Sequence, residues 1–277
     1  MQIESIISQS LSEEIRSKGH QSIRFSPDGF SLLVADTHFS PVLLQAYRFG
    51  KLKSTADLFG KCAEILSEIR LLDFGGETTL VCDNSSITLI PESLYSEENT
   101  RMYLNRAADL KQSDEIRMTA LEHRKEILLY AYSRELQDFS EQFQSGIRIK
   151  HSTGCLLSLA DQVRASDHQR GMLMADVQNA SVSILVIQQD RVCMLNRFRL
   201  HDESGFIYHV LNTFRQLKLD RETIPVYLSG IVHRRHEYFH LLNKYIRNIG
   251  ETPYYIESVG SETRMAHMLL TEAIKCA

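Results

Sequence analysis

The 277-residue sequence contains no tryptophan, only five prolines and thirteen glycines. It therefore has no proline- or glycine-rich stretch of the kind that forms linkers or low-complexity segments. No run of about 18 apolar residues occurs, so we expect no membrane-spanning helix. The first 16 residues lack a basic region followed by a long apolar core. This pattern predicts a cytoplasmic protein without a secretory signal.

Basic charge and paired cysteines are also scarce. The formal net charge is −4, which argues against a nucleic-acid-binding surface, since such surfaces carry a basic excess. The cysteines are odd in number and form no C-x-x-C pair, so we expect reduced, buried thiols. They are Cys62, Cys82, Cys155, Cys193 and Cys276. No P-loop, G-x-S-x-G or dinucleotide-binding fingerprint is present. The 43% hydrophobic content is typical of a globular protein.

The stretch from Met172 to Leu200 predicts three consecutive strands. Its apolar and β-branched runs cover residues 172–177, 182–188 and 192–200, and short polar segments separate them. Such spacing is typical of antiparallel hairpins. After these strands the pattern predicts three helices alternating with two strands. The predicted ranges are helix 204–217, strand 224–228, helix 233–249, strand 253–256 and helix 262–275.

The first half of the chain has a similar order. Two strands flank a Pro-Asp-Gly turn within residues 22–36, and a third strand follows at 42–49. Residues 1–20 are predicted to hold at most a short leading strand or helix. The later elements are helix 53–72, strand 78–82, an extended run 86–90, helix 97–110, strands 115–121 and 126–130, helix 134–143, strand 147–151 and helix 154–163.

Both halves share the order βββαβαβα once the extra segment near residues 86–143 is set aside. Three hairpin-linked strands must be antiparallel, whereas the later strands cross over through helices and pair in parallel. The prediction is an α/β protein with two domains, each built on a mixed five-stranded sheet. The first domain covers residues 1–168 and includes the extra segment, and the second covers residues 169–277.

This order resembles the actin-like ATPase superfamily, whose members contain two ribonuclease-H-like domains. Within it, the chain looks most similar to an uncharacterised bacterial family with an actin-like fold, and to relatives in pilus assembly and type II secretion. The resemblance covers about residues 20–277. It implies an actin-like arrangement of the two domains with a central cleft that binds ATP and magnesium.

In that superfamily a hairpin turn of the form Asp-x-Gly in each domain cradles phosphates. The Asp holds Mg²⁺ or its waters, and the Gly allows backbone N–H groups to approach a phosphate closely. The second domain keeps the acid as Asp176, but Gln178 stands at the glycine position and Asn179 follows. Asp176 could equally do no more than stabilise the hairpin.

The other two motifs are more strongly altered. In the first domain Arg24 takes the place of the Asp and Ser26 that of the Gly. Arg24 could still attract a phosphate by charge. The Gly-Gly pair that lies against adenosine in the superfamily is reduced to Gly230, preceded by Ser229 and followed by Ile231. The resemblance therefore implies a vestigial nucleotide site.

A better match to the phosphate loop, Asp73 to Thr79 (DFGGETT), lies elsewhere. It follows a predicted helix, whereas the motif must join two strands of a hairpin. We therefore interpret it as a helix end before a strand.

One further motif competes with this interpretation. His236 and His240 lie four residues apart in an H-E-x-x-H sequence, which suits Zn²⁺ on one helix face with Glu237 as a general base. A third ligand would come from one of three later carboxylates: Glu251, Glu257 or Glu262. Against a metal site, His233 and two arginines make the start of this helix basic.

The lost glycines favour a non-catalytic actin-like protein with no catalytic residues and no cofactor, acting as an interaction or assembly scaffold. Its extra segment would dock an unidentified protein partner, and a homodimer is possible. A nucleotide-binding ATPase or kinase-like phosphotransferase that uses ATP with magnesium is the first alternative. A zinc hydrolase that uses the H-E-x-x-H helix is the second.

Overall fold

The computed structural model describes seven stretches of the chain: residues 2–50, 52–144, 146–167, 171–178, 180–230, 237–251 and 268–275. The chain divides into two compact units. Unit 1 comprises Met1–Gly154 together with Ala273–Ala277, and unit 2 comprises Cys155–Glu272. Helix α5 (Ser152–Asp167) leads from the last strand of unit 1 to the first strand of unit 2. The division into units falls at the start of this helix, and the domain boundary predicted at residue 168 falls at its end.

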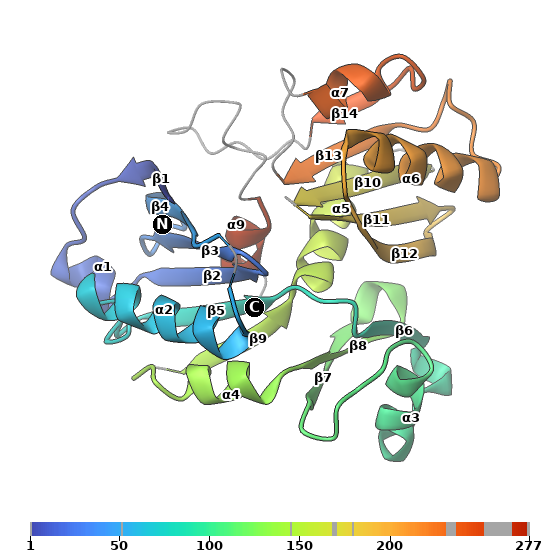
Figure 1. Cartoon of the computed structure of the whole chain (residues 1–277). Helices are drawn as coiled ribbons and strands as arrows, with labels where there is room; N and C mark the ends of the chain where they lie inside the picture. Colours follow the sequence, from blue (N-terminus) through green and yellow to red (C-terminus); the bar gives the residue numbers. More distant parts are fainter. Residues whose placement is uncertain are drawn as a thin grey trace. The chain divides into compact units, whose positions relative to one another are not determined.

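Unit 1 is built on a six-stranded mixed sheet in the order β1-β4-β3-β2-β5-β9 (Figure 1). Its strands are β1 (Gln2–Ser8), β2 (His20–Ser26), β3 (Gly29–Ala35), β4 (Pro41–Arg48), β5 (Glu77–Cys82) and β9 (Ile147–His151). The prediction of five strands was wrong here, because β1 adds a sixth strand that pairs antiparallel with β4. Helix α1 (Glu13–Lys18) links β1 to β2, and helix α2 (Thr55–Glu68) links β4 to β5.

The extra segment between β5 and β9 forms a second, three-stranded sheet in unit 1, which we call the insert sheet. Its order is β6-β8-β7, and both pairings are antiparallel. The elements are β6 (Ile87–Pro91), α3 (Thr100–Asn105), β7 (Glu115–Leu121) and β8 (Glu126–Tyr132), followed by α4 (Arg134–Ser140). The predicted strand pair at 115–121 and 126–130 is confirmed, whereas the helix predicted at 97–110 is restricted to α3 and a preceding 3₁₀ turn at Glu97–Asn99.

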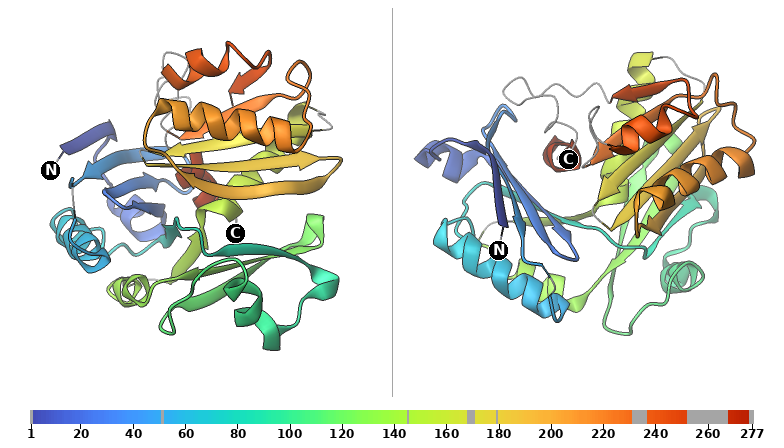
Figure 2. Two further views of the ribbon diagram at one scale, coloured as in Figure 1. Left: turned by 45° about the vertical axis from the view of Figure 1, so that its right-hand side comes forward. Right: turned by 45° about the horizontal axis from the view of Figure 1, so that its top comes forward.

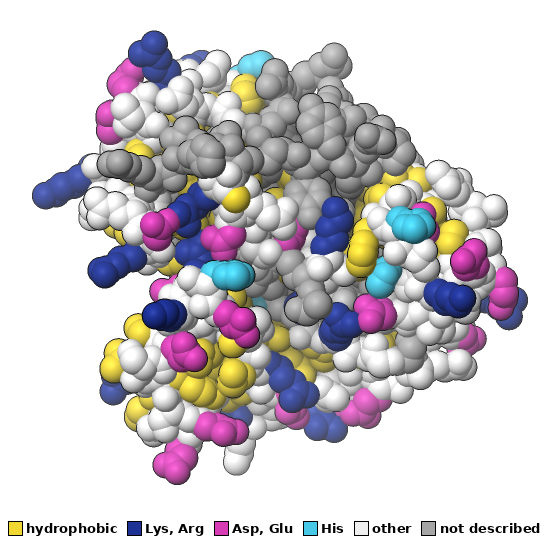
Figure 3. Space-filling view, turned by 180° about the vertical axis from the view of Figure 1, so that it is seen from behind, with side chains coloured by type: hydrophobic (Ala, Val, Ile, Leu, Met, Phe, Trp, Pro, Cys, Tyr) yellow, Lys and Arg dark blue, Asp and Glu magenta, His cyan; other side chains and the backbone are white. Residues whose placement is uncertain are grey.

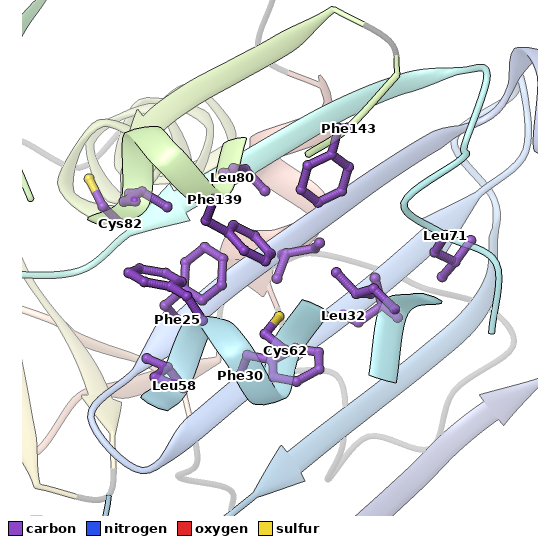
Figure 4. Packing of buried hydrophobic residues seen from close by; sticks show 14 of the residues in the cluster. Phe25, Phe30, Leu32, Leu58, Cys62, Leu71, Leu80, Cys82, Phe139 and Phe143 are labelled. Carbon is purple, nitrogen blue, oxygen red and sulfur yellow. The ribbon is translucent and has the colours of Figure 1, made fainter. Parts of the chain in front are cut away.

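The core of unit 1 joins its sheet to helices α2 and α4 through aromatic side chains (Figure 4). Phe25 of β2 meets Phe59 of α2 edge-on, with ring centroids 5.1 Å apart, and Phe139 of α4 at 5.6 Å. Phe59 and Phe139 stack at 5.2 Å. Aromatic pairs of this kind stabilise a core beyond the area they bury. This contact therefore fixes both helices against the end of β2.

Unit 2 has the predicted mixed five-stranded sheet, in the order β12-β11-β10-β13-β14. The elements are β10 (Gly171–Gln178), β11 (Ser181–Gln188), β12 (Arg191–Arg199), α6 (Glu203–Gln216), β13 (Val226–Gly230), α7 (Glu237–Leu242) and β14 (Ile249–Glu251). Helix α6 lies along one face of this sheet (Figure 2) and buries Phe206, Val210 and Phe214. Helix α9 (Met268–Lys275) begins in unit 2 and ends in unit 1, because the division falls between Glu272 and Ala273.

The C-terminal part differs from the prediction in the length of one helix. The helix predicted at 233–249 ends at Leu242, and residues 249–251 form strand β14 instead. Two backbone N–H groups, of Tyr245 and Ile246, close a turn on the Leu242 carbonyl. The strand predicted at 253–256 lies outside the described residues, and α9 is the described part of the helix predicted at 262–275. No described helix has the length and apolar character that a membrane span needs.

Candidate functional site

Arg24 and Asp176 occupy corresponding positions in their two sheets. Each lies two residues before the end of a central strand, β2 or β10, that has an antiparallel hairpin partner on one side and a parallel partner on the other. The C-terminal ends of parallel strands are where open α/β sheets place their ligands. In both units the side chain at this position makes hydrogen bonds within the protein.

In unit 2 the Asp176 side chain is only 1% exposed. Ser229 donates a hydrogen bond from Oγ to Asp176 Oδ1 at 3.1 Å. The Gln178 amide approaches Asp176 Oδ2 at 3.4 Å from the position where the superfamily motif has glycine. A carboxylate must expose oxygen atoms to bind Mg²⁺ or its water ligands. Here both oxygens already face side-chain donors of the same unit.

Gly230, which we predicted to be the remaining glycine of a Gly-Gly motif, is required by the fold itself. Its φ is +88°, which side chains other than glycine rarely adopt. A Cβ atom at this position would lie 1.9 Å from the Val177 carbonyl oxygen, because β13 ends close against β10. Backbone packing therefore accounts for this glycine without a nucleotide.

In unit 1 the corresponding edge is closed by a buried ion pair. Arg24 Nη2 donates to Asp83 Oδ2 at 2.7 Å, and the two side chains are 7% and 2% exposed. Ser152, at the start of α5, donates from Oγ to the other oxygen, Asp83 Oδ1, at 2.8 Å. Charge-assisted hydrogen bonds of this length are among the stronger polar contacts in proteins. The charge of Arg24 is thus matched by an internal carboxylate.

His151 completes this polar cluster as a neutral side chain. It is 2% exposed, and burial, with the nearby Arg24 charge, lowers its pKa to about 3. The Thr153 backbone N–H lies 3.1 Å from its Nδ1. The described part of the cluster therefore holds one guanidinium and one carboxylate at neutral pH, with no additional positive charge from His151.

A pocket of 430 Å³ opens beside this cluster, entirely within unit 1. Its walls come from the β2–β3 turn, the first turns of α2, the end of β5 and the start of α4. Among the lining residues are the apolar Phe25, Leu58, Phe59, Tyr132 and Leu136 and the polar Thr55, Asp83, Asn84 and Ser133. Asp83 therefore belongs to both the ion pair and the pocket. Pockets of this size with mostly apolar walls and a few polar groups are typical ligand sites.

The predicted site residues separate into two groups. Arg24 lies in unit 1, whereas Asp176, Gln178, Ser229 and Gly230 meet in unit 2; Asn179 lies outside the described residues. The sequence interpretation missed Asp83 and Ser152. Asp83 directly follows the buried strand β5, at the end of a parallel strand where ligand-binding and network residues gather, and this position was the available signal.

The two remaining motifs are resolved differently. Residues 69–76 connect α2 to β5, which confirms that Asp73–Thr79 leads from a helix into a strand and does not join two strands of a hairpin. His240 is an exposed residue of α7, while His236, Glu257 and Glu262 and the Glu251 side chain are not described. In the described ranges no three His, Cys, Asp or Glu residues are placed to hold a metal ion.

Comparison with known proteins identifies the family and the fold. A family model described as "Protein of unknown function (DUF3822)" matches residues 8–249. No curated protein matches the chain. The resemblance to the actin-like ATPase fold is confirmed by the solved structures that follow.

A protein of unknown function with an actin-like ATPase fold from Bacteroides thetaiotaomicron aligns over 97% of this chain and all of its own, with a TM-score of 0.75 and 16% identity. The PilM–PilN type IV pilus biogenesis complex aligns over 95% of this chain and 98% of its own, with a TM-score of 0.65 and 13% identity. The ethanolamine utilization protein EutJ from Carboxydothermus hydrogenoformans aligns over 95% and 91%, with a TM-score of 0.51 and 7% identity. At these identities the likeness shows the fold alone.

Proposed function

The chain belongs to the DUF3822 family and has the actin-like ATPase fold, and we propose that it is a non-catalytic member of that fold. In this proposal the protein is an interaction or assembly scaffold whose shape does not depend on a nucleotide. The fold by itself supports many functions, so the proposal depends on the residues at the former motif positions.

The observation that carries the proposal is the ion pair between Arg24 and Asp83. A phosphate-binding edge needs donors or a metal that remain available to the ligand. Here the residue at the motif position is a cation that is already neutralised at 2.7 Å by a buried carboxylate. A phosphate would have to displace Asp83, and the displaced carboxylate would then lie buried without its cation. The internal pair therefore opposes nucleotide binding in unit 1.

The unit 2 edge supports the same conclusion. Asp176 is buried and accepts a hydrogen bond from Ser229, and Gln178 adds a side chain where phosphate would require a close backbone approach. Gly230 is retained for a reason of backbone packing. Each feature that resembles a nucleotide motif thus has a role in the fold of its own unit.

We place the partner site at the unit 1 pocket. Apolar residues form about half of its lining, and Thr55 and Ser133 supply hydroxyl groups. Such a site suits an extended peptide segment that inserts one bulky apolar side chain and makes a few hydrogen bonds at the rim. One wall is Tyr132, the last residue of the insert sheet, so the extra segment contributes directly. PilM, which shares the fold, is found in a complex with a partner protein, PilN.

A photo-crosslinking amino acid at Thr55, an exposed pocket residue, tests this role. The matched control carries it at Tyr208, which is 61% exposed in unit 2. We expect a discrete protein adduct from position 55 in cells, none from position 208, and the same adduct yield with and without added Mg-ATP. An adduct that requires Mg-ATP, or ATP turnover that is lost in Asp176→Asn, would overturn the scaffold proposal. Equal labelling from both positions would remove the pocket from it.

A further inference from the structure

Strand β7 forms one edge of the insert sheet. It pairs with β8 on one side, and no other strand in the described ranges pairs with its second side. Exposed edges of this kind are usually blunted by charge, proline or a covering element, because they otherwise pair with another chain. The four consecutive residues 117–120 of β7 are all exposed, and the last three of them, Met118, Thr119 and Ala120, carry no charge.

Large apolar side chains are exposed beside this edge. Leu94 is 68% exposed, and Met102 and Met118 are 45% and 48% exposed. Two tyrosines contact two of these residues: the Tyr95 hydroxyl contacts Met118 Sδ at 3.4 Å, and the Tyr103 hydroxyl donates to the Leu94 carbonyl at 2.9 Å. In the space-filling view, hydrophobic side chains reach the surface over this part of the chain, at the lower left (Figure 3). Exposed apolar patches at a sheet edge mark interaction surfaces.

We propose that β7 pairs antiparallel with β7 of a second copy of the chain, centred on Met118. The sequence of the strand is compatible with pairing to itself. In this register Met118 faces its own copy and Ile116 faces Ala120, so the face that carries α3 becomes continuously apolar. On the other face Arg117 lies opposite Thr119, and Glu115 lies opposite Leu121. No like charges lie directly opposite each other, and the two Arg117 side chains, which are diagonal neighbours, each donate to the Tyr132 hydroxyl of their own copy at 3.1 Å. Two-fold symmetry closes the pair.

This surface is independent of the former nucleotide motifs and of the pocket. Pairing between two copies differs from binding of an unrelated protein in one testable respect. The residue on the two-fold axis, Met118, lies opposite Met118 of the second copy. Directly opposed Cα atoms in an antiparallel pair are about 4.5–5.5 Å apart, within the range that a disulfide spans. Two copies of Ala120, in contrast, would lie about 13 Å apart along the strands.

The experiment is disulfide crosslinking of the full chain in a Cys193→Ser background, since Cys193 is the exposed cysteine among the described residues. We expect Met118→Cys to form a covalent dimer on mild oxidation. Ala120→Cys should form none alone but should crosslink when mixed with Ile116→Cys. The Cys193→Ser protein without a new cysteine sets the background. Absence of a Met118→Cys dimer above this background would overturn the pairing, as would equal crosslinking of Ala120→Cys.

Sedimentation velocity gives a second, non-covalent test. The wild type should show a concentration-dependent dimer, and Met118→Asp should raise its dissociation constant by at least about tenfold, because two carboxylates would then face each other. Tyr208→Asp, at an exposed position in unit 2, should leave the dissociation constant unchanged. A wild type that stays monomeric at about 100 µM would contradict the proposal. Neither result bears on the proposal that the protein is a nucleotide-independent scaffold, which is tested separately by crosslinking at Thr55.

Discussion

Removing the Asp83 carboxylate should destabilise the protein far more than an ordinary polar substitution. Asp83→Ala leaves the Arg24 guanidinium, 7% exposed, without the oxygen that lies 2.7 Å away. Breaking a buried pair by removing one partner costs about 3–5 kcal/mol, because the remaining charge stays desolvated. Because both side chains are buried, solvent screening should not reduce this figure much. With a urea dependence of about 2 kcal/mol per molar, the unfolding midpoint should fall by roughly 2 M.

The assay is urea unfolding followed by circular dichroism, which suits a chain without tryptophan. Two further variants separate the effect of the buried charge from that of the neighbouring hydrogen bond. Ser152→Ala removes one hydrogen bond to a charged oxygen and should cost about 1.5–3 kcal/mol. The double variant Arg24→Met, Asp83→Ala should recover at least about 2 kcal/mol of the loss seen in Asp83→Ala, since no charge is then left buried.

A loss below about 1 kcal/mol in Asp83→Ala would refute this reasoning. It would mean that water or another group solvates Arg24 when Asp83 is absent. An arginine solvated in that way could meet a phosphate, and the ion pair would no longer argue against a nucleotide in unit 1.

Two further predictions concern Gly230 and His151. Gly230→Ala should lower the free energy of unfolding in urea by at least about 2 kcal/mol, because its φ of +88° and the Val177 carbonyl both exclude a Cβ. The control is Gly60→Ala in helix α2, where a Cβ would meet nothing within 4 Å, and this change should stabilise the protein by about 0.5–1 kcal/mol. Equal effects of the two substitutions would contradict the packing argument. Below about pH 6 His151 is protonated in the unfolded chain, whereas the buried imidazole stays neutral down to about pH 3. As the pH falls, the wild type should therefore lose up to about 1.4 kcal/mol of folding stability per pH unit more than His151→Phe. Urea unfolding midpoints of both proteins at pH 7 and pH 5 measure this difference. Parallel pH profiles would show that His151 takes up its proton in the folded state.

Local sequence patterns were sufficient for most of unit 2 and for the central strands of unit 1. The β-branched run of β11 and the short polar turns beside it predict the hairpins, and the same order in both halves predicts mixed sheets. The outer strands of the sheets were harder to predict from the sequence. Residues 2–8 are short and partly polar, so their assignment to β1 depends on pairing with β4, about 40 residues away. The apolar spacing of residues 233–249 predicted a single helix. Instead, the Val226 N–H donates a hydrogen bond to the Asn248 carbonyl, and the chain that follows pairs with β13 as strand β14.

The candidate site depended even more on distant contacts. Arg24 could be recognised as a departure from an acidic motif, but its partner lies 59 residues later. Neither Asp83 nor Ser152 belongs to a sequence motif, and only the parallel pairing of β2, β5 and β9 brings the ends of their strands together. Sequence patterns therefore indicated altered phosphate motifs, and the tertiary structure shows which internal contacts Arg24 makes at one of these positions.

The most direct test of the central claim is calorimetric titration of the full chain with Mg-ATP. The ion pair of Arg24 with Asp83 and the buried Asp176 predict no binding heat up to millimolar nucleotide, and the same null result for Asp176→Asn. Micromolar binding that weakens at least tenfold in Asp176→Asn would contradict the account, because it would show that the nucleotide site still works.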